Sequence, residues 1–357
     1  MKPPVEDPST PQDRLQAVTR RQALYGAGGT LATAGLLSSL GPLLNTPTIE
    51  AASARAGNLN PNGPYYWIAH VGPGDPYWAV VQHGVKLVSQ RLNVKATFEG
   101  PAGYNPSQQA DMVNAAISAG AAGIVTTAAN PASIADPVKR AAQAGIPVVF
   151  SDTPPPAGFA ATFVGGTPLA FVGINIETAA KRAAAMVVPL LPHGARVVIV
   201  NHEPGNIVLE TKSRGYIEGL ASISPKVDRL VIGEQTTRAI EIMRAYYSRT
   251  PDLKAIFTLG ALGTDATVKF LDGSKIPPSK IRVVGSDVDA VTLDAIKRGR
   301  VVATIGIDQL MYGFIPIVQL YLYNAYALIP NSYNSTGETV SKANVAAYAA
   351  LAAKGYR

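Results

Sequence analysis

Acidic, amide and aromatic side chains follow several segments that the sequence predicts to be buried strands. A carboxylate can accept hydrogen bonds from two hydroxyl groups at once, and such charge-assisted bonds are stronger than neutral ones. An aromatic ring packs its apolar face against C–H groups. These side-chain types together suit a small molecule that carries several hydroxyl groups. The residues with this placement are Asp75, Tyr77, Trp78, Asp152, Glu203, Asn206, Asp287, Asp308 and Gln309.

Each acidic candidate that follows a strand also has a structural interpretation. Asp75, Asp287 and Asp308 stand just before predicted helices, where a carboxylate is a favoured N-cap. Asp152 precedes Thr-Pro-Pro and could serve that turn. These alternatives stay open on the sequence alone.

The other candidates have different alternatives. Tyr77 and Trp78 could belong to the hydrophobic core, since large aromatic residues are often buried. Glu203 and Asn206 could lie in a solvated loop, which is the usual place for such residues. The prediction of a binding site therefore rests on the joint placement of these side chains at strand ends, and not on any one of them.

The sequence predicts neither catalytic residues nor a metal or cofactor site. It contains no cysteine, which excludes disulfides, thiol catalysis, cysteine-based metal sites and a lipid on an N-terminal cysteine. Its four histidines lack metal-like spacing, and no Ser–His–Asp order or Gly-rich phosphate loop stands out. We expect His70 and His202 to be structural. We expect Lys212 to be exposed on the face of a helix.

The elements that must position these residues alternate between short apolar runs and helical patterns, which favours parallel sheets covered by helices. In the first half of the chain we expect a βα series. Its predicted strands are 65–71, 94–98, 123–127 and 147–152, and its predicted helices are 77–92, 107–119 and 133–144.

A second series follows a Gly/Pro-rich stretch that ends near residue 166. Its predicted strands are 171–175, 196–202, 230–234, 255–259, 281–287 and 301–308, and its predicted helices are 177–190, 208–221, 237–247, 265–271, 290–297 and 309–328. Two such series in 357 residues predict an α/β protein of two doubly wound parallel-sheet lobes.

The predicted division of the chain follows from these series. We expect an N-terminal lobe at 65–166 that is completed by about 309–336, a C-terminal lobe at 167–308, and a hinge-crossing tail at 337–357. In open α/β sheets, ligands bind beyond the carboxyl ends of the strands. If two such lobes face each other, these ends meet at one cleft, and domain interfaces favour small-molecule sites.

The first 54 residues read as an export signal of the twin-arginine type. Arg20-Arg21 precedes an uncharged stretch rich in Ala, Gly and Leu, which ends at the small-residue pattern Ala52-Ser53-Ala54. The alternative is a membrane anchor, but five Gly and Pro residues make the stretch a poor one. Residues 55–64 read as a flexible leader. We therefore expect a periplasmic protein that is not stably inserted in a membrane after cleavage.

The formal net charge of +7 does not point to nucleic acid. Four basic and four acidic residues cancel within 1–54, so the excess lies in the remainder of the chain, where it is spread out. Nucleic-acid binding usually needs clustered Lys and Arg. We expect no nucleic-acid partner.

Five segments in order resemble the type I periplasmic sugar-binding proteins, such as the ribose-binding and autoinducer-2-binding proteins of ABC importers. The resemblance covers roughly residues 65–345. The segments are Gly74-Asp75-Pro76-Tyr77-Trp78, Phe98-Glu99-Gly100-Pro101, Ala144-Gly145-Ile146-Pro147-Val148-Val149 leading to Asp152, Val283-Val284-Gly285-Ser286-Asp287, and Ala303-Thr304-Ile305-Gly306-Ile307-Asp308-Gln309.

This resemblance implies two lobes joined by crossover strands, which close by a hinge on a small sugar or polyol and present it to an ABC importer permease. It implies that Asp75, Tyr77 and Trp78 form the first contact loop, that Asp152, Asp287, Asp308 and Gln309 supply polar groups, and that Glu203 to Asn206 form the second-lobe loop. It implies no enzyme. A periplasmic sensor subunit that presents its closed form to a membrane receptor is the alternative.

Three positions depart from the ribose-binding members of this family. Thr153 stands where they carry arginine, Gly260 where they carry a side-chain amide, and Glu210 or Lys212 where arginine is common. These differences leave the choice between a pyranose and a polyol open.

Overall fold

A computed structural model describes residues 60–155 and 169–357. The predicted signal peptide at 1–54 and most of the predicted leader lie outside the described residues. Within the leader, residues 60–64 form a turn that enters the first strand.

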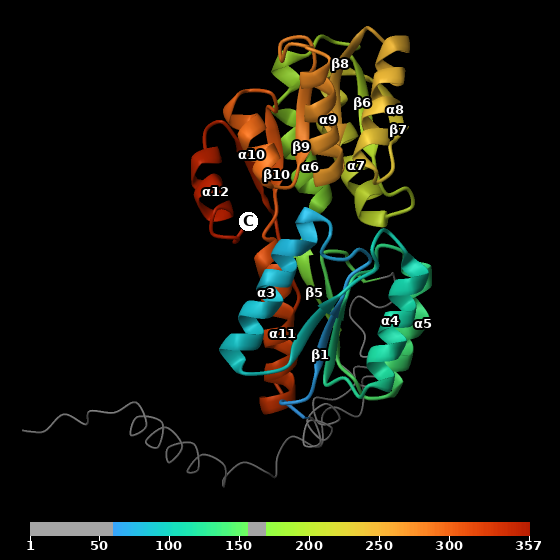
Figure 1. Cartoon of the computed structure of the whole chain (residues 1–357), viewed down its shortest axis with the longest axis vertical. Helices are drawn as coiled ribbons and strands as arrows, with labels where there is room; N and C mark the ends of the chain where they lie inside the picture. Colours follow the sequence, from blue (N-terminus) through green and yellow to red (C-terminus); the bar gives the residue numbers. More distant parts are fainter. Residues whose placement is uncertain (1–59, 156–168) are drawn as a thin grey trace, which may run out of the picture. The chain divides into compact units, whose positions relative to one another are not determined.

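The first lobe is built on a six-stranded sheet in the order β11-β5-β4-β3-β1-β2 (Figure 1). All of its strand pairs are parallel. Helices α4 and α5 cover one face of this sheet, and α3 and α11 cover the other. The bounds are β1 (Tyr65–Ile68), α3 (Pro76–Leu92), β2 (Ala96–Glu99), α4 (Pro106–Ser118), β3 (Gly123–Thr126), α5 (Pro131–Gln143), β4 (Val148–Ser151), β5 (Leu169–Ile174), α11 (Gln309–Tyr326) and β11 (Tyr333–Ser335).

The second lobe repeats this plan with the sheet order β12-β10-β9-β8-β6-β7. Only β12 runs antiparallel to its neighbour, β10. Helices α6 and α7 pack on one face and α8, α9 and α10 on the other. The bounds are α6 (Ile176–Ala185), β6 (Arg196–Asn201), α7 (Ile207–Gly219), β7 (Lys226–Val231), α8 (Thr236–Arg249), β8 (Leu253–Thr258), α9 (Ala261–Gly273), β9 (Arg282–Ser286), α10 (Ala290–Lys297), β10 (Ala303–Gly306), β12 (Glu338–Ser341) and α12 (Val345–Ala352).

The predicted boundary between the two lobes needs a correction. The sequence predicts that the strand at 171–175 opens the C-terminal lobe, but β5 pairs along its length with β4, with Phe150 opposite Phe171, so it belongs to the first sheet. The chain passes between lobes one element later than expected, at α6. The reason is that an all-apolar strand fits the interior of either sheet, and its composition does not select one.

The tail also differs from the expectation. Residues 337–357 do not only cross the hinge, because β12 forms an edge of the second sheet and α12 packs against α10. Residue Gly337, at φ +60°, lies in the short link between β11 and β12. The last part of the chain therefore completes both sheets in turn.

The polar residues at the strand ends begin helices. Asp75 accepts a hydrogen bond from the Tyr77 N–H at 2.8 Å, and Pro76 occupies the first helical position, where its missing N–H costs nothing. Asn206 caps α7 in the same way and accepts from the Val208 N–H at 3.0 Å. The fold therefore holds two polar side chains at the carboxyl edges of the sheets through the start of the following helices.

Helix α11 is the most apolar of the long helices in the first lobe. It packs against α3 and against the sheet. Tyr312, Ile317 and Leu320 are fully buried. Gly313 lets the two helix backbones approach closely, because an added Cβ there would overlap the Val81 carbonyl oxygen. Across residues 60–155 and 169–357, no helix combines the length and apolar character that crossing a membrane requires.

Helices α6 and α7 pack with the same closeness in the second lobe, and this yields a stability prediction. An added Cβ at Gly215 would overlap the Glu177 carbonyl oxygen and lie 2.8 Å from the Ala180 Cβ. We expect Gly215→Ala to lower the free energy of unfolding by about 1–3 kcal/mol, because the helices must move apart. Urea denaturation followed by circular dichroism measures this change.

Gly273 offers the matched control. It ends helix α9, an added Cβ there would have no atom within 4 Å, and its backbone is not left-handed. We expect Gly273→Ala to change stability by no more than about 0.5 kcal/mol. Equal losses in the two variants would mean that close helix contact is not what Gly215 provides.

Candidate functional site

One cavity lies between the carboxyl ends of the two sheets, and we call it the interlobe cavity. Its walls come from both lobes, because the loops after β1 and β4 face those after β6, β8 and β9. Hydrophobic side chains, among them Ile174, Leu209 and Ile307, fill the space between its polar groups. Seven of the nine candidates from the sequence line it: Asp75, Tyr77, Trp78, Asp152, Glu203, Asn206 and Asp287.

Asp152 is held at the end of β4 by two hydroxyl groups. The Tyr77 hydroxyl donates a short hydrogen bond to Asp152 Oδ1, and Thr153 Oγ1 donates to Oδ2 at 3.0 Å. Thr153 therefore orients the carboxylate. Burial, with Asp152 as a further cause, raises the pKa of Tyr77 well above its usual value, so the phenol stays a donor.

Asp287 occupies the corresponding position at the end of β9 in the second lobe. Its Oδ2 accepts a hydrogen bond from the Ala261 N–H at 2.9 Å, whereas Oδ1 is buried and has no partner among the described residues. Burial raises the pKa of Asp287 to about 6, although nearby Lys212 acts in the opposite direction. Asp287 is thus a buried acceptor with one oxygen available to a ligand donor.

The backbone at both aspartates is unusual. Asp152 has φ +63° and Asp287 has φ +71°, in the left-handed region that non-glycine residues seldom adopt. Aspartate and asparagine tolerate this region better than other residues. Such strained positions concentrate at ligand sites, and here one follows a strand in each lobe.

Asp75 joins the acidic wall from the start of α3. Burial raises its pKa to about 7, with Glu203 and Asp287 adding to the rise and the Tyr77 N–H opposing it. The expected N-cap role of Asp75 is observed. This role does not conflict with its place in the cavity, because only Oδ1 is engaged by the backbone.

Glu203 lies between two histidines, one from each lobe. Its Oε2 is 3.7 Å from His70 Nε2, and its Oε1 is 3.6 Å from His202 Nε2. Asn206 Nδ2 donates to Glu203 Oε2 at 2.7 Å and lies 3.3 Å from His70 Nε2. Burial would raise the pKa of Glu203, but the histidines and Asn206 outweigh it and lower the pKa to about 2.

The two histidines do more than fill space. His70 Nδ1 is 2.8 Å from Thr127 Oγ1, which fixes its ring, and both histidines line the interlobe cavity. Burial lowers the pKa of His202 below its usual value, against the opposing effect of Glu203. Its Nδ1 is buried with no partner among the described residues. The prediction that His70 and His202 are structural is therefore incomplete, because both residues also line the interlobe cavity.

The prediction that Lys212 is exposed is wrong. Only 3% of the residue is exposed, and its Nζ donates to the Leu259 carbonyl at 2.6 Å and to Ser286 Oγ at 2.7 Å. Helical spacing could have found it, because Lys212 shares the buried face of α7 with Leu209 and Tyr216. The site thus contains one buried ammonium group.

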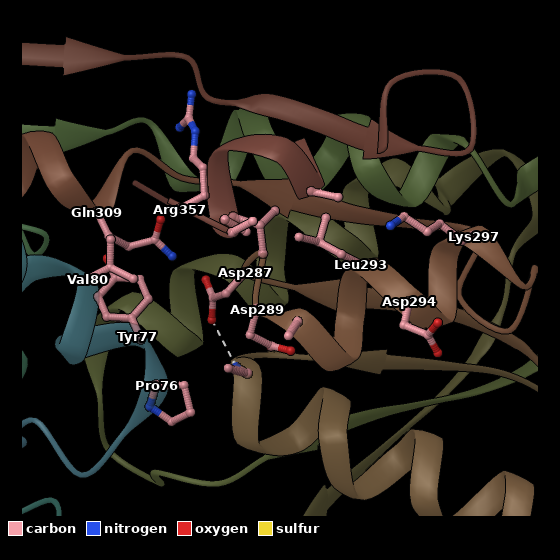
Figure 2. Close-up of a pocket in the computed structure, with 16 residues that line it drawn as sticks. Pro76, Tyr77, Val80, Asp287, Asp289, Leu293, Asp294, Lys297, Gln309 and Arg357 are labelled. Atoms are coloured by element: carbon pink, nitrogen blue, oxygen red, sulfur yellow. Dashed lines mark hydrogen bonds between the residues drawn. The ribbon is translucent and has the colours of Figure 1, made fainter. Parts of the chain in front are cut away.

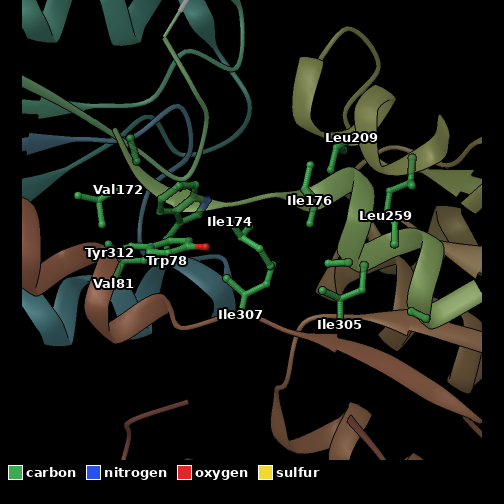
Figure 3. Packing of buried hydrophobic residues seen from close by; sticks show 14 of the residues in the cluster. Trp78, Val81, Val172, Ile174, Ile176, Leu209, Leu259, Ile305, Ile307 and Tyr312 are labelled. Atoms are coloured by element: carbon green, nitrogen blue, oxygen red, sulfur yellow. The ribbon is translucent and has the colours of Figure 1, made fainter. Parts of the chain in front are cut away.

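Trp78 is both core residue and cavity wall (Figure 3). It is 3% exposed and packs in a cluster with Trp67, at a centroid distance of 5.6 Å, and His70, at 5.1 Å. Figure 3 shows its ring beside Ile174 and Tyr312 at the junction of the lobes. Both interpretations given by the sequence therefore apply to Trp78.

The structure does not bring Asp308 and Gln309 into the interlobe cavity. Asp308 forms an ion pair with Arg357. Gln309 lines a second cavity beside the first, which shares Tyr77 and Asp287 with it (Figure 2). The Oε1 atom of Gln309 is buried without a partner among the described residues, so it too is an available acceptor.

The chemistry of the interlobe cavity is that of an acceptor-rich binding site. Four carboxylates face one ammonium group, and apolar walls complete the lining. Across residues 60–155 and 169–357, no group of three or more histidine or acidic side chains is arranged to hold a metal ion. The arrangement can accept several hydrogen bonds from a buried, hydroxyl-rich molecule.

Comparison with known proteins agrees with this geometry. A family model described as the periplasmic binding protein domain matches residues 67–325. The chain belongs to this family. The predicted fold class, with two doubly wound α/β lobes and a cleft between them, is confirmed, as is the resemblance to type I periplasmic binding proteins.

This chain is similar to three individual proteins of known name. A curated relative, the xylose/arabinose-binding protein XylF of Sulfolobus acidocaldarius, is 22% identical and the match covers 93% of this chain and 88% of that protein. A periplasmic sugar-binding protein from Legionella pneumophila is 25% identical, with a TM-score of 0.70 and coverage of 77% and 99%. A carbohydrate transporter from Acidothermus cellulolyticus, solved with myo-inositol, is 21% identical, with a TM-score of 0.73 and coverage of 83% and 100%.

Proposed function

We propose that this periplasmic binding protein captures a small neutral sugar or polyol in the interlobe cavity and delivers it to an ABC importer permease. The observation that carries the proposal is the convergence of strand-end carboxylates from both lobes on one cavity, with Asp287 Oδ1 unpartnered among the described residues. A hydroxyl donor from a ligand would satisfy this oxygen, and a buried acceptor without a partner is costly.

The ligand class follows from charge. The carboxylates Asp75, Asp152, Glu203 and Asp287 would repel an acidic sugar, and Lys212 already donates to two protein groups. Vicinal hydroxyls match carboxylate acceptors, and a C–H face of a ring matches the aromatic wall at Tyr77 and Trp78. The names of the relatives, which mention xylose, arabinose and myo-inositol, agree with this class.

The proposal includes export of the protein across the cytoplasmic membrane. Support comes from the family and from the sequence pattern at Arg20-Arg21 with its following uncharged stretch, which favours the twin-arginine route. Binding would shift the two lobes toward the closed arrangement, because only that arrangement contacts the ligand from both sides. An affinity near 1 μM would correspond to about −8 kcal/mol.

Isothermal titration calorimetry of residues 55–357 tests the proposal. The panel consists of myo-inositol, D-xylose, arabinose, glucuronate and glutamate. We expect a neutral polyhydroxylated compound to bind with micromolar affinity and the two acids not to bind. NMR of the recovered ligand should show it unchanged, since the proposed role is transport and not turnover. Binding of the acids alone, or conversion of the sugar, would contradict it.

Binding should also depend on pH. The pKa of Asp287 is raised to about 6 and that of Asp75 to about 7. Near neutrality, a fraction of the protein molecules therefore carries each of these carboxyl groups in its protonated form. A hydroxyl donor favours the ionised carboxylate, and a protonated one must first lose its proton. We expect affinity for a neutral sugar to rise by at least about tenfold from pH 5 to pH 8, which is the change that ionisation of Asp287 alone would give.

Calorimetry in two buffers checks the same point independently. Because binding selects the ionised carboxylates, it should release protons at pH 6, and the observed enthalpy should therefore differ between phosphate and imidazole buffers. An affinity that stays constant from pH 5 to pH 8, with equal enthalpies in both buffers, would mean that neither carboxylate changes its protonation on binding.

A further inference from the structure

The covalent connections between the lobes lie along one edge of the sheets. The chain crosses between lobes at three places: from β5 to α6, from β10 to α11, and from β11 to β12. In both sheets these strands lie at or next to one edge, and β2 and β7 form the other edge. A rotation about the crossovers therefore separates the loops after β2 and β7 by the largest distance.

At that far edge a carboxylate of the second lobe binds the backbone of the first. Glu234, three residues beyond β7, accepts a hydrogen bond on Oε1 from the Tyr104 N–H at 3.0 Å. Its Oε2 lies so close to Gly103 that an added Cβ there would be 2.6 Å away. We call this pair of interactions the rim contact.

A hydrogen bond between two backbone groups also joins the lobes. The Ile207 N–H, in the first turn of α7, donates to the Ala129 carbonyl oxygen beyond β3 at 3.0 Å. This bond joins two backbones, so no side chain can be removed to test it. The rim contact differs because a single side chain supplies its acceptor.

Glu234 is placed to act on closure and not on the ligand. It does not line the interlobe cavity. It lines a separate crevice at the rim, together with Gly74, Ala102 and Gln235 and with the cavity residues Asp75 and Glu203. Its side chain is half-buried, and an N–H donor at 3.0 Å is a normal bond to a carboxylate.

We propose that Glu234 is a positioning residue that stabilises the closed arrangement through the rim contact and thereby slows release of the bound sugar. This inference rests on the proposed function only in naming the ligand as a sugar. The rim contact affects closure of the lobes whether or not a ligand is bound. Removing the contact lowers the population of the closed arrangement by the same factor for every ligand, so selectivity among ligands does not change.

Gly103 gives a second and independent way to break the same contact. A methyl group at this position meets only the end of a flexible side chain, so Gly103→Ala displaces the Glu234 carboxylate without disturbing either lobe. We expect Glu234→Ala and Gly103→Ala each to speed ligand dissociation by about fivefold. The double variant should equal either single variant, because both changes remove one interaction.

The measurement uses stopped-flow dissociation of myo-inositol, D-xylose or arabinose, whichever binds the unsubstituted protein. Glu234→Gln keeps a carbonyl acceptor and should lose no more than about twofold. Glu241→Ala, exposed on α8, should change nothing. Effects that multiply in the double variant, or an unchanged dissociation rate in Glu234→Ala, would overturn the inference.

A ligand-free readout separates this inference from the proposed function. The chain has no cysteine, so spin labels attach only at cysteines introduced at exposed Asp111 on α4 and exposed Arg244 on α8. Pulsed electron spin resonance measures the distance between them. We expect Glu234→Ala and Gly103→Ala to lower the short-distance share about fivefold. Equal distance distributions in all variants would overturn the rim contact even if sugars bind, and a failed sugar panel would leave this result standing.

Discussion

Asp287→Asn should weaken binding of the neutral sugar by about 10- to 100-fold, with little loss of stability. The Oδ1 atom of Asp287 is buried in the interlobe cavity, and a ligand hydroxyl bound there forms a charge-assisted bond worth about 1.5–3 kcal/mol. Asparagine halves the number of acceptor atoms and removes the charge. Calorimetry at pH 8, where the aspartate is ionised, measures the full difference.

Asparagine is chosen because the backbone at residue 287 is left-handed, at φ +71°. Asparagine tolerates that conformation and can still accept the hydrogen bond from the Ala261 N–H through its carbonyl oxygen. Asp294→Asn, exposed on α10, is the control and should bind like the unsubstituted protein. If Asp287→Asn retains the original dissociation constant, the ligand does not contact this carboxylate.

Lys212→Met should impair both stability and binding. The ammonium group is buried and donates to the Leu259 carbonyl and to Ser286 Oγ, and methionine leaves both acceptors without it. A buried acceptor that loses its donor costs about 1–3 kcal/mol. Chemical denaturation should therefore show a loss of about 2–4 kcal/mol in the free energy of unfolding.

The same variant should move the pH dependence of binding. Lys212 lowers the pKa of Asp287 against the effect of burial, so its removal raises that pKa further above about 6. A higher pKa means that the carboxyl is protonated up to a higher pH, and the pH at which affinity falls should shift upward. Lys181→Met, which removes an exposed cation on α6, should leave the profile in place. An unshifted profile in Lys212→Met would show that Lys212 does not act on Asp287.

The sequence predicts the plan of the site because the plan depends on local patterns. Apolar runs followed by Asp152 and Asp287 mark buried parallel strands with polar carboxyl ends, and parallel strands bring these ends to one edge. Asp75 before Pro76 marks a helix start at the same edge. These signals need no knowledge of distant contacts.

Features that depend on distant partners could not be predicted in this way. Asp308 looks like another strand-end acceptor, but Arg357, far along the chain, neutralises it. Strands β11 (Tyr333–Ser335) and β12 (Glu338–Ser341) are short and largely polar, so no apolar run marks them. The exposure predicted for Lys212 is wrong for another reason, because that prediction gives its charge more weight than the buried helix face that carries it.

The three crossings have a consequence for the entropy of ligand capture. Three covalent links placed along one edge of the sheets can bend together, but they resist twisting and sideways sliding of one lobe against the other. The free lobes therefore explore mainly a single angular coordinate. Few relative orientations are lost when they come together, so little of the interaction energy with the ligand is consumed in ordering the protein.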